Sequence, residues 1–343
     1  MLTDLSLTAN LIVFACAGVV ILLAGTKMTG LADRIADRTG LGEAVTGGLL
    51  LGAATSLSGT VVSITSALDG RASLAFSNGV GGIAAQTAFL ALADLIYRRA
   101  NLEHAAADVA NLFQSTLLML MLVVPLGAFV MPELTFWSVH PASAVLVGIY
   151  LFGAYASVGV RHSPMWKAVD TSETRADHPE DEDHARRGTT ELLVPFTALM
   201  ALMGIAGWAI ARSAGALTEQ LGLSSALVGA LMTAVVTSLP ELVTTLAAVR
   251  RGALQLAVGG IIGGNTFDVL FLTLSDISYR DGSIYHAIGP GDVFWVVVGL
   301  AMTAVLLIGL ILREKSGPAN IGWESATLLA IYGGAVGYQA WSG

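Results

Sequence analysis

Long apolar stretches alternate with short polar segments along almost the whole chain of 343 residues. Ten of these stretches approach or exceed the roughly 20 residues that a helix needs to cross a lipid bilayer. They cover residues 8–32, 41–68, 72–97, 106–132, 139–159, 190–212, 222–249, 253–275, 291–312 and 320–341. The pattern predicts an all-α polytopic membrane protein with ten transmembrane helices.

The longest polar segment, residues 160–188, separates the fifth predicted helix from the sixth. It contains the mixed-charge run RADHPEDEDHARR and no apolar stripe, which is typical of a flexible loop. The segment divides the chain into residues 1–159 and residues 189–343, with five predicted helices in each part.

Basic residues collect at one end of the predicted helices. If the N-terminus lies outside, the inner loops and helix ends hold 14 of the 17 Lys and Arg residues, and the outer ones hold the other three. The outer three are Arg71, Arg212 and Arg280. Positive residues favour the cytoplasmic side. We therefore expect both termini outside, a cytoplasmic 160–188 loop, and residence in the inner membrane of a bacterium-like cell.

An internal repeat relates the two parts of the chain at an offset of 182 positions. The matched sets include Thr55-Ser56-Leu57 with Thr237-Ser238-Leu239, Gly81-Gly82 with Gly263-Gly264, and Asp94 with Asp276. The register runs without a gap from residues 41–98 to residues 223–280. Because five is odd, the second set of helices enters the membrane from the opposite side. Two inverted five-helix repeats are a transporter architecture, with the binding site where broken helices meet.

Two carboxylates in the second repeat lie near the middle of predicted helices. Pro240 removes a backbone hydrogen bond and kinks its helix, and Glu241 follows at once. In the next helix GGIIGGNTFDVLF places glycines and Asn265 at mid-depth, followed by Asp268. An ionisable residue at this depth costs at least about 2.5–3.5 kcal/mol, so it is a candidate for function.

The groups around these carboxylates form an oxygen-only lining. The hydroxyls of Thr237 and Ser238, the amide of Asn265, freed carbonyls and the two carboxylates are all oxygen ligands. Such a lining suits hard cations such as Ca²⁺ or Na⁺.

The run TSLPEL, followed by G-x-x-x-G-G-N-x-x-D, resembles the second alpha-repeat of the calcium/cation antiporter superfamily, which includes Na⁺/Ca²⁺ exchangers. The lead-in segments GTKMTGLADRIADRTGLGEAVTGGLLLGAATSL and GWAIARSAGALTEQLGLSSALVGALMTAVVTSL are also similar to that family. The resemblance implies alpha-repeat motifs at about 41–98 and 223–280. It also implies an ion site where the second and third helices of each repeat cross.

The resemblance carries over to individual positions. In the second repeat it assigns Glu241 and Asp268 as ligands, with Thr237, Ser238 and Asn265 lining the site. In the first repeat the matching positions are Thr55, Ser56 and Gln86. This chain departs from the family at Gly59, where a Glu is expected, at Gln86, where an Asn is common, and at Ser58, where the family has the helix-breaking Pro.

The combined evidence predicts a secondary cation antiporter that exchanges Ca²⁺ for Na⁺ or H⁺ by alternating access. Two alternatives stay open: a monovalent cation/H⁺ antiporter, and a non-transporting sensor or assembly protein that retains the fold. No enzyme is expected, because the chain has no HExxH, GxSxG or P-loop motif. The expected partners are inorganic cations and the lipid bilayer rather than nucleic acid, and no cofactor is expected besides the transported cation.

The composition agrees with this interpretation. The chain is 55% hydrophobic and only 12% charged, about half the charged fraction of an ordinary soluble protein. Cys16 is its one cysteine, which excludes an intramolecular disulfide and a cysteine metal cluster.

Overall fold

The computed structural model describes residues 5–39, 52, 54–97, 100–162, 166–169, 171, 189–315, 317 and 321–342. The regular elements in these ranges are helices, apart from an isolated β-bridge between Phe136 and Val139. The helices are α1 (Leu7–Thr39), α3 (Leu57–Leu68), α4 (Ala72–Ile96), α5 (Leu102–Ala106), α6 (Val109–Val130), α7 (Pro141–His162), α8 (Thr189–Leu221), α9 (Ser225–Leu227), the π-helical turn η4 (Val228–Thr233), α10 (Ala234–Thr237), α11 (Leu239–Arg251), α12 (Leu254–Asp268), α13 (Leu270–Ser278), α14 (Ile284–Ala287), α15 (Pro290–Leu312) and α16 (Trp323–Ser342).

Seven helices in the described ranges are long and apolar enough to cross a membrane, and a pair bent by 47° between α10 and α11 raises the number to eight. Two of the ten predicted spans are not among these eight. Residues 41–68 are represented by α3, because residues 40–51 and 53 lie outside the described ranges. Residues 320–341 correspond to α16, a helix of 20 residues. The helical membrane fold is thus confirmed, and the number of ten spans stays a prediction.

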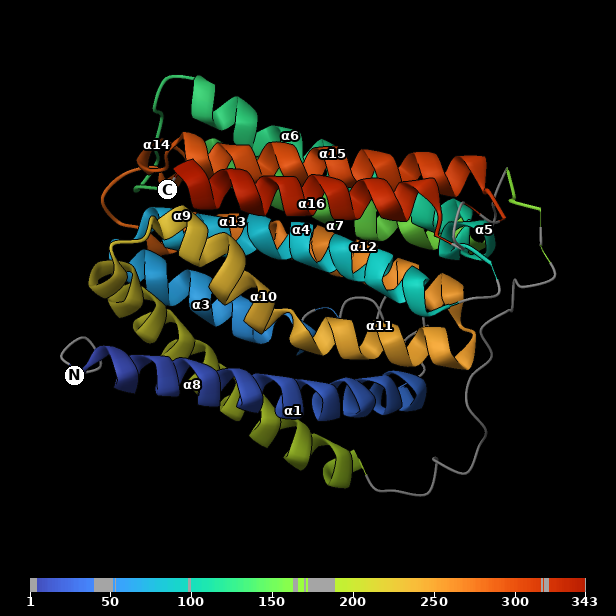
Figure 1. Ribbon diagram of the computed structural model, residues 1–343, viewed down its shortest axis with the longest axis horizontal. Helices are drawn as coiled ribbons and strands as arrows, with labels where there is room; N and C mark the ends of the chain where they lie inside the picture. Colours follow the sequence, from blue (N-terminus) through green and yellow to red (C-terminus); the bar gives the residue numbers. More distant parts are fainter. Residues whose placement is uncertain are drawn as a thin grey trace.

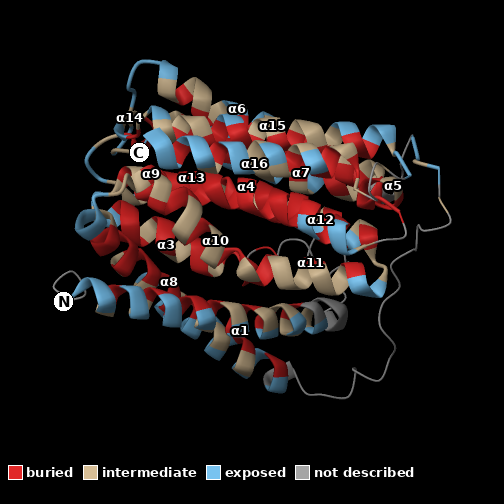
Figure 2. Ribbon diagram, viewed as in Figure 1, coloured by how far each residue is buried: buried red, intermediate tan, exposed pale blue. Residues whose placement is uncertain are grey.

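Helix α4 runs through the middle of the molecule, between α16 on one side and α3 with α10 on the other (Figure 1). It is a helix of membrane-spanning length, yet 21 of its 25 residues are buried, so it is surrounded by protein rather than lipid (Figure 2). Small residues allow this close packing. A β-carbon added to Gly81 would lie 2.3 Å from Cα of Ala230, so only glycine lets η4 approach α4 this closely.

Helices α1 and α8 cross each other along one edge of the molecule, and their outward faces are exposed (Figures 1 and 2). Each of these two helices packs closely against a neighbouring helix at a glycine. A β-carbon on Gly25 of α1 would lie 2.4 Å from Cγ of Pro240, and one on Gly207 of α8 would lie 2.7 Å from the carbonyl oxygen of Ser58. These two crossing points are themselves a matched pair of the repeat, and each lies next to the bend in a neighbouring helix.

The helix boundaries follow the same offset of 182 positions as the sequence repeat. The pairs that begin at matching positions are α1 with α8, α3 with α11, α4 with α12, α5 with α14, and α7 with α16. The short helices α5 and α14 lie at opposite ends of the bundle, with the chain termini at the α14 end (Figure 1). Neither short helix was predicted from the sequence.

Candidate cation site

The second repeat contributes a bent helix to the centre of the protein. Helix α10 ends at Thr237, Ser238 leaves helical geometry with φ −94° and ψ 5°, and α11 begins at Leu239. Pro240 occupies the first turn of α11, where a missing backbone donor costs nothing. The bend places Glu241 in the first turn of α11, facing the protein interior with 5% of its surface exposed.

The first repeat bends at the matching residue without a proline. Ser56 has φ −81° and ψ 1°, and α3 begins immediately after it. The hydroxyl of Ser58, at the position matching Pro240, donates to the carbonyl oxygen of Thr237 at 3.4 Å. The bend therefore does not depend on Pro at this position.

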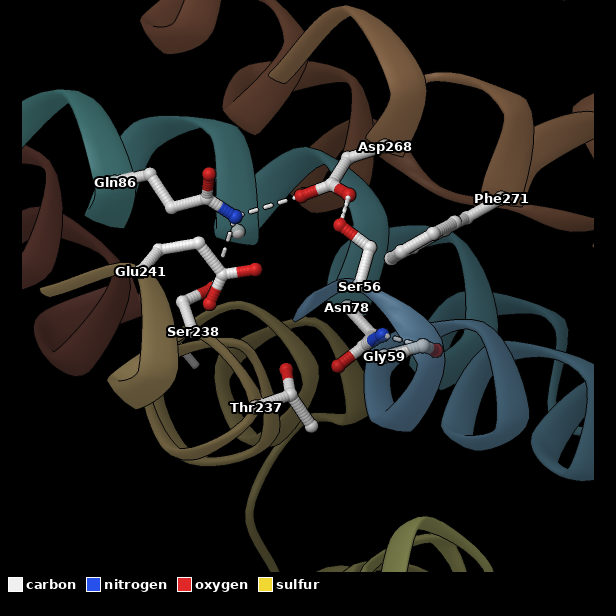
Figure 3. Close-up of a pocket in the computed structure, with 10 residues that line it drawn as sticks. Ser56, Gly59, Asn78, Gln86, Thr237, Ser238, Glu241, Asp268 and Phe271 are labelled. Atoms are coloured by element: carbon white, nitrogen blue, oxygen red, sulfur yellow. Dashed lines mark hydrogen bonds between the residues drawn. The ribbon is translucent and has the colours of Figure 1, made fainter. Parts of the chain in front are cut away.

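Asp268 is the last residue of α12, and its carboxylate accepts hydrogen bonds from two residues of the first half of the chain. The Ser56 hydroxyl donates to Oδ1 at 2.6 Å, and the Gln86 amide on α4 donates to Oδ2 at 2.7 Å. The same amide nitrogen also donates to the Ser238 hydroxyl at 3.2 Å. Gln86 thus connects the carboxylate of α12 to the bend in the second repeat (Figure 3).

The carboxylate of Glu241 has fewer hydrogen-bond donors than the carboxylate of Asp268. The Thr55 hydroxyl interacts with its carboxyl group, whereas Oε2 is buried and has no hydrogen-bond partner among the described residues. The two carboxylates are close enough to repel each other. The ion pairs in the described part of the chain, Arg71 with Glu219 and Arg212 with Asp69, lie elsewhere.

Both carboxylates line one small cavity. Its volume of about 10 Å³ for the centre of a water-sized sphere leaves room for about one water molecule or bare cation. The residues that line it are Ser56, Gly59, Asn78, Gly82, Gln86, Thr237, Ser238, Glu241, Asp268 and Phe271 (Figure 3). Two further buried acceptors, Oε1 of Gln86 and Oδ1 of Asn265, have no partner in the described ranges.

At Gly59, where the family resemblance predicts a glutamate, the side chain of an aromatic residue from another helix occupies the space. A β-carbon on Gly59 would lie 2.7 Å from Cε2 of Phe271 and 3.6 Å from Oγ1 of Thr237. The ring therefore occupies the space that a side chain at residue 59 would need. The Gly59 carbonyl accepts a hydrogen bond from the Asn78 amide at 3.1 Å, which fixes the backbone behind the ring.

The structure brings most of the predicted residues together. Ser56, Gln86, Thr237, Ser238, Glu241 and Asp268 line the cavity. Thr55 is outside the lining but interacts with Glu241. Asn265 is also outside it, and its amide donates to the Thr87 hydroxyl at 3.0 Å.

Three cavity residues were not predicted from the sequence: Asn78, Gly82 and Phe271. All three follow the helical period, since Asn78 and Gly82 lie about two turns and one turn before Gln86, and Phe271 lies about one turn after Asp268. For Gly82 and Phe271, that spacing is a signal that a search for polar residues alone does not use.

The family model described as "Sodium/calcium exchanger protein" matches residues 9–159 and 191–341. The two matched segments together cover most of the chain.

Two individual relatives differ in how much of their length is matched. The sodium/calcium exchanger MaX1 of Methanosarcina acetivorans is 33% identical over 116 residues, so the match spans 33% of this chain but only 31% of that protein. The putative antiporter CaxA of Alkalimonas amylolytica is 25% identical over 328 residues, which are 95% of this chain and 97% of that protein.

Solved structures share the fold along nearly the whole chain. The crystal structure of the H⁺/Ca²⁺ exchanger CAX has a TM-score of 0.70 at 13% identity and covers 96% of this chain and 85% of that one. A structure of the sodium-calcium exchanger NCX_Mj, soaked with Na⁺ and Sr²⁺, has a TM-score of 0.63 at 17% identity and covers 97% of this chain and 99% of that one.

Proposed function

Because the chain belongs to the sodium/calcium exchanger protein family, we propose that it is a secondary antiporter that binds Ca²⁺ between Glu241 and Asp268 in exchange for Na⁺ or H⁺. One observation carries this proposal. The two buried carboxylates face one small cavity and have no ion-pair partner in the described part of the chain.

The ligand chemistry supports a hard cation. Buried, uncompensated charge is unfavourable, so each carboxylate needs a cation or a proton. The cavity offers oxygen acceptors without partners, among them Oε2 of Glu241 and Oε1 of Gln86. Oxygen ligands of this kind suit Ca²⁺ or Na⁺, and with the helices as they stand here the cavity has room for one Ca²⁺ ion.

The number of charges favours an electroneutral exchange. Two carboxylates neutralise one divalent cation, and they equally accept two protons or two Na⁺ ions in turn. Gly59 and Phe271 leave no space for a third acid, so no additional cation is needed for charge balance. One Ca²⁺ for two monovalent ions is therefore the stoichiometry that we propose.

The proposed transport cycle uses the glycine contacts that α1 and α8 make with the helices of the cation site. Gly25 contacts Pro240 beside Glu241, and Gly207 contacts Ser58 beside Gly59. Sliding of α1 and α8 across these contacts would expose the cavity to one side of the membrane at a time, which is alternating access. We include in the proposal ten membrane crossings arranged as two inverted repeats, residues 1–159 and 189–343. The matched helix boundaries support this arrangement.

The proposed topology places both termini outside and residues 160–188 in the cytoplasm. The common location of the termini at the α14 end of the bundle supports it, and so does the excess of Lys and Arg at the other end of the predicted helices. In this orientation α5 lies at the cytoplasmic end and α14 at the outer end.

A second candidate is a monovalent cation/H⁺ antiporter with the same site. It is favoured by the substitution of Gly59 for an acid, which gives the site less charge than the family pattern. The two candidates use the same carboxylates, Glu241 and Asp268, and differ in whether Ca²⁺ is one of the exchanged ions.

The test is uptake of ⁴⁵Ca²⁺ into proteoliposomes loaded in turn with Na⁺, K⁺ or a proton gradient. We expect gradient-dependent uptake by the native protein and none by Asp268→Asn or Glu241→Gln. The control is Glu191→Gln, which changes an exposed acid at the start of α8. Absence of Ca²⁺ uptake with retained Na⁺ or K⁺ flux would select the monovalent candidate, and unchanged uptake in both variants would exclude this site.

A further inference from the structure

Away from the candidate cation site, each end of the bundle has one aspartate whose carboxylate connects neighbouring segments through hydrogen bonds. These two aspartates are a matched pair of the repeat. At one end, Asp94 of α4 accepts from the backbone N–H of Leu102 at 2.8 Å and of Gly322 at 3.3 Å. At the other end, Asp276 of α13 accepts from the N–H of Ile284 at 3.0 Å and of His140 at 2.7 Å. Every residue of one set lies 182 positions from its counterpart.

The α14 end satisfies its carboxylate with neutral groups. The Ser143 hydroxyl donates to Oδ2 of Asp276 at 2.7 Å and lies 3.0 Å from the Tyr285 hydroxyl. His140 packs edge-on against the Tyr285 ring, with ring centroids 5.4 Å apart. Both oxygens of the buried Asp276 carboxylate therefore accept hydrogen bonds at this end.

The α5 end keeps a serine, Ser325, at the position matching Ser143, but it has acids at two other matching positions. Glu103 stands at the position matching Tyr285, and Glu324 stands at the position matching Ala142. Both are buried, with 1% and 0% of their surface exposed. Neither oxygen of Glu324 has a hydrogen-bond partner among the described residues, and Oε2 of Glu103 also lacks one.

Glycines bring the two glutamates side by side. A β-carbon on Gly309 of α15 would lie 2.9 Å from Cγ of Glu324 and 3.2 Å from Cγ of Glu103. A β-carbon on Gly322 would lie 2.9 Å from Cδ of Glu324. Any larger residue at these positions would push the acids apart.

Among the described residues, no cation neutralises the pair. Arg313, which follows α15, donates to the carbonyl oxygens of His104 and Val169, so its guanidinium is engaged elsewhere. Glu314 and Lys315 follow it, and Asp94 is the charged group on the α4 side. Arg98 and Arg99 lie outside the described residues. No group of three or more His, Cys, Asp or Glu residues within the described ranges has the geometry to hold a metal ion.

We propose that Glu103 and Glu324 form a proton-binding site at the α5 end of the bundle. A proton from water attaches to one carboxylate oxygen, and that carboxyl group then donates to the other carboxylate. The shared proton joins α5 to α16, and its release returns it to water and leaves adjacent negative charges in a buried space. This site is separate from the cavity between Glu241 and Asp268, and the inference does not rest on the proposed function.

The electrostatics of the pair favour the bound proton. Burial, followed by the charges of Asp94 and Glu324, raises the pKa of Glu103 well above its usual range. A raised pKa in the folded state means that the folded protein holds more protons than the unfolded chain. Stability is then greatest below the ordinary Glu pKa and is lost as pH rises through the raised value.

The test measures the thermal unfolding of the detergent-purified protein from pH 5 to pH 9, together with the infrared band of protonated carboxyl groups. We expect Glu324→Gln to lower the number of protons released on unfolding by about one per molecule and to remove one protonated-carboxyl band. Glu103→Gln should give the same result, which keeps the test usable if one variant does not fold.

Tyr285→Phe, at the matching position of the other end, is the control and should leave both measurements unchanged. Calcium and a chelator, each added alone, distinguish a proton from a metal ion in the site. Unchanged proton release and infrared spectra in both glutamine variants would overturn the proposal. A rise in melting temperature with calcium that the native protein shows and both glutamine variants lose would overturn it as well.

Discussion

The two halves of the cation site are built on the same backbone but carry different chemistry. Both halves bend at a serine, Ser56 in one and Ser238 in the other, with nearly the same φ and ψ angles. Three residues later the second half has Glu241 and the first half has Gly59, with the Phe271 ring against it. The bend is therefore retained independently of the charge. The backbone provides the geometry of the site, and one side chain per half decides how much charge it holds.

The largest expected effect comes from removing a carboxylate of the charged half. Glu241→Gln or Asp268→Asn should abolish stabilisation by the bound cation, because a cation bound by one carboxylate leaves uncompensated charge. At a free cation concentration a hundred times the dissociation constant, that stabilisation is worth about 2.7 kcal/mol. Thermal unfolding with and without Ca²⁺ measures it. Equal Ca²⁺ shifts in native and variant proteins would contradict the assignment.

The next effect comes from adding a carboxylate to the uncharged half. Gly59→Glu should destabilise the protein by about 1–3 kcal/mol, because its β-carbon would lie 2.7 Å from the Phe271 ring. The pair Gly59→Glu with Phe271→Ala should recover part of this loss and make ion uptake depend on membrane potential, since a third acid changes the charge balance. Purely additive unfolding free energies of the two changes would show that the ring and residue 59 are independent.

A smaller effect is expected at the glycine contacts of α1 with α11 and of α8 with α3. Gly25→Ala and Gly207→Ala each place a methyl group against a neighbouring helix, at 2.4 Å and 2.7 Å. The steric cost of about 1–3 kcal/mol is partly offset by the better helix propensity of Ala, which is worth up to about 1 kcal/mol. We expect slower ion exchange with a net loss of stability of up to about 2 kcal/mol. Gly30→Ala and Gly204→Ala are matched controls, because no atom lies within 4 Å of their added β-carbon. Equal rates for all four variants would exclude a role for these contacts in gating.

The smallest effect concerns pH at the α14 end. Burial lowers the pKa of His140, although Asp276 opposes that shift. Its Nδ1 accepts a hydrogen bond from the Ala142 N–H at 3.1 Å, which only the neutral ring can do. A lowered pKa means that stability is present above the ordinary His pKa and is lost as pH falls below it. His140→Gln should remove this loss, with an effect of about 1 kcal/mol for one hydrogen bond. The unfolding midpoint measured between pH 5 and pH 7 tests this. A variant whose midpoint falls with decreasing pH as much as that of the native protein would contradict the prediction.

The sequence predicted the helices well where apolar runs and the internal register agreed. The starts of α4 and α12, for example, fall within one residue of the predicted spans. The short helices α5 and α14 were missed because four or five residues are too few for a helical period to be recognised. They form because a buried aspartate, Asp94 or Asp276, accepts the N–H of the first residue of each, and a contact eight residues distant leaves no local pattern.

The candidate site was predictable in its charges but not in its packing. Glu241 and Asp268 are conspicuous because acids are rare in apolar helices. The role of Phe271 was not predictable, because an aromatic residue in an apolar helix is ordinary and its ring direction depends on tertiary contacts. The bend at Ser56 was also unexpected, since the sequence has Ser58 where a proline would have explained it.

The contact between Gly59 and Phe271 also restricts how the protein can change by mutation. A chain that regains an acid at residue 59 alone meets the ring, whereas one that loses the ring alone leaves a cavity that costs about 3–5 kcal/mol. Both single steps are therefore unfavourable, although the pair of changes together is compatible with the fold. Selection acting on one substitution at a time meets a barrier in both directions. Such a barrier would keep a two-acid site as it is, even where a three-acid site would serve the cell better.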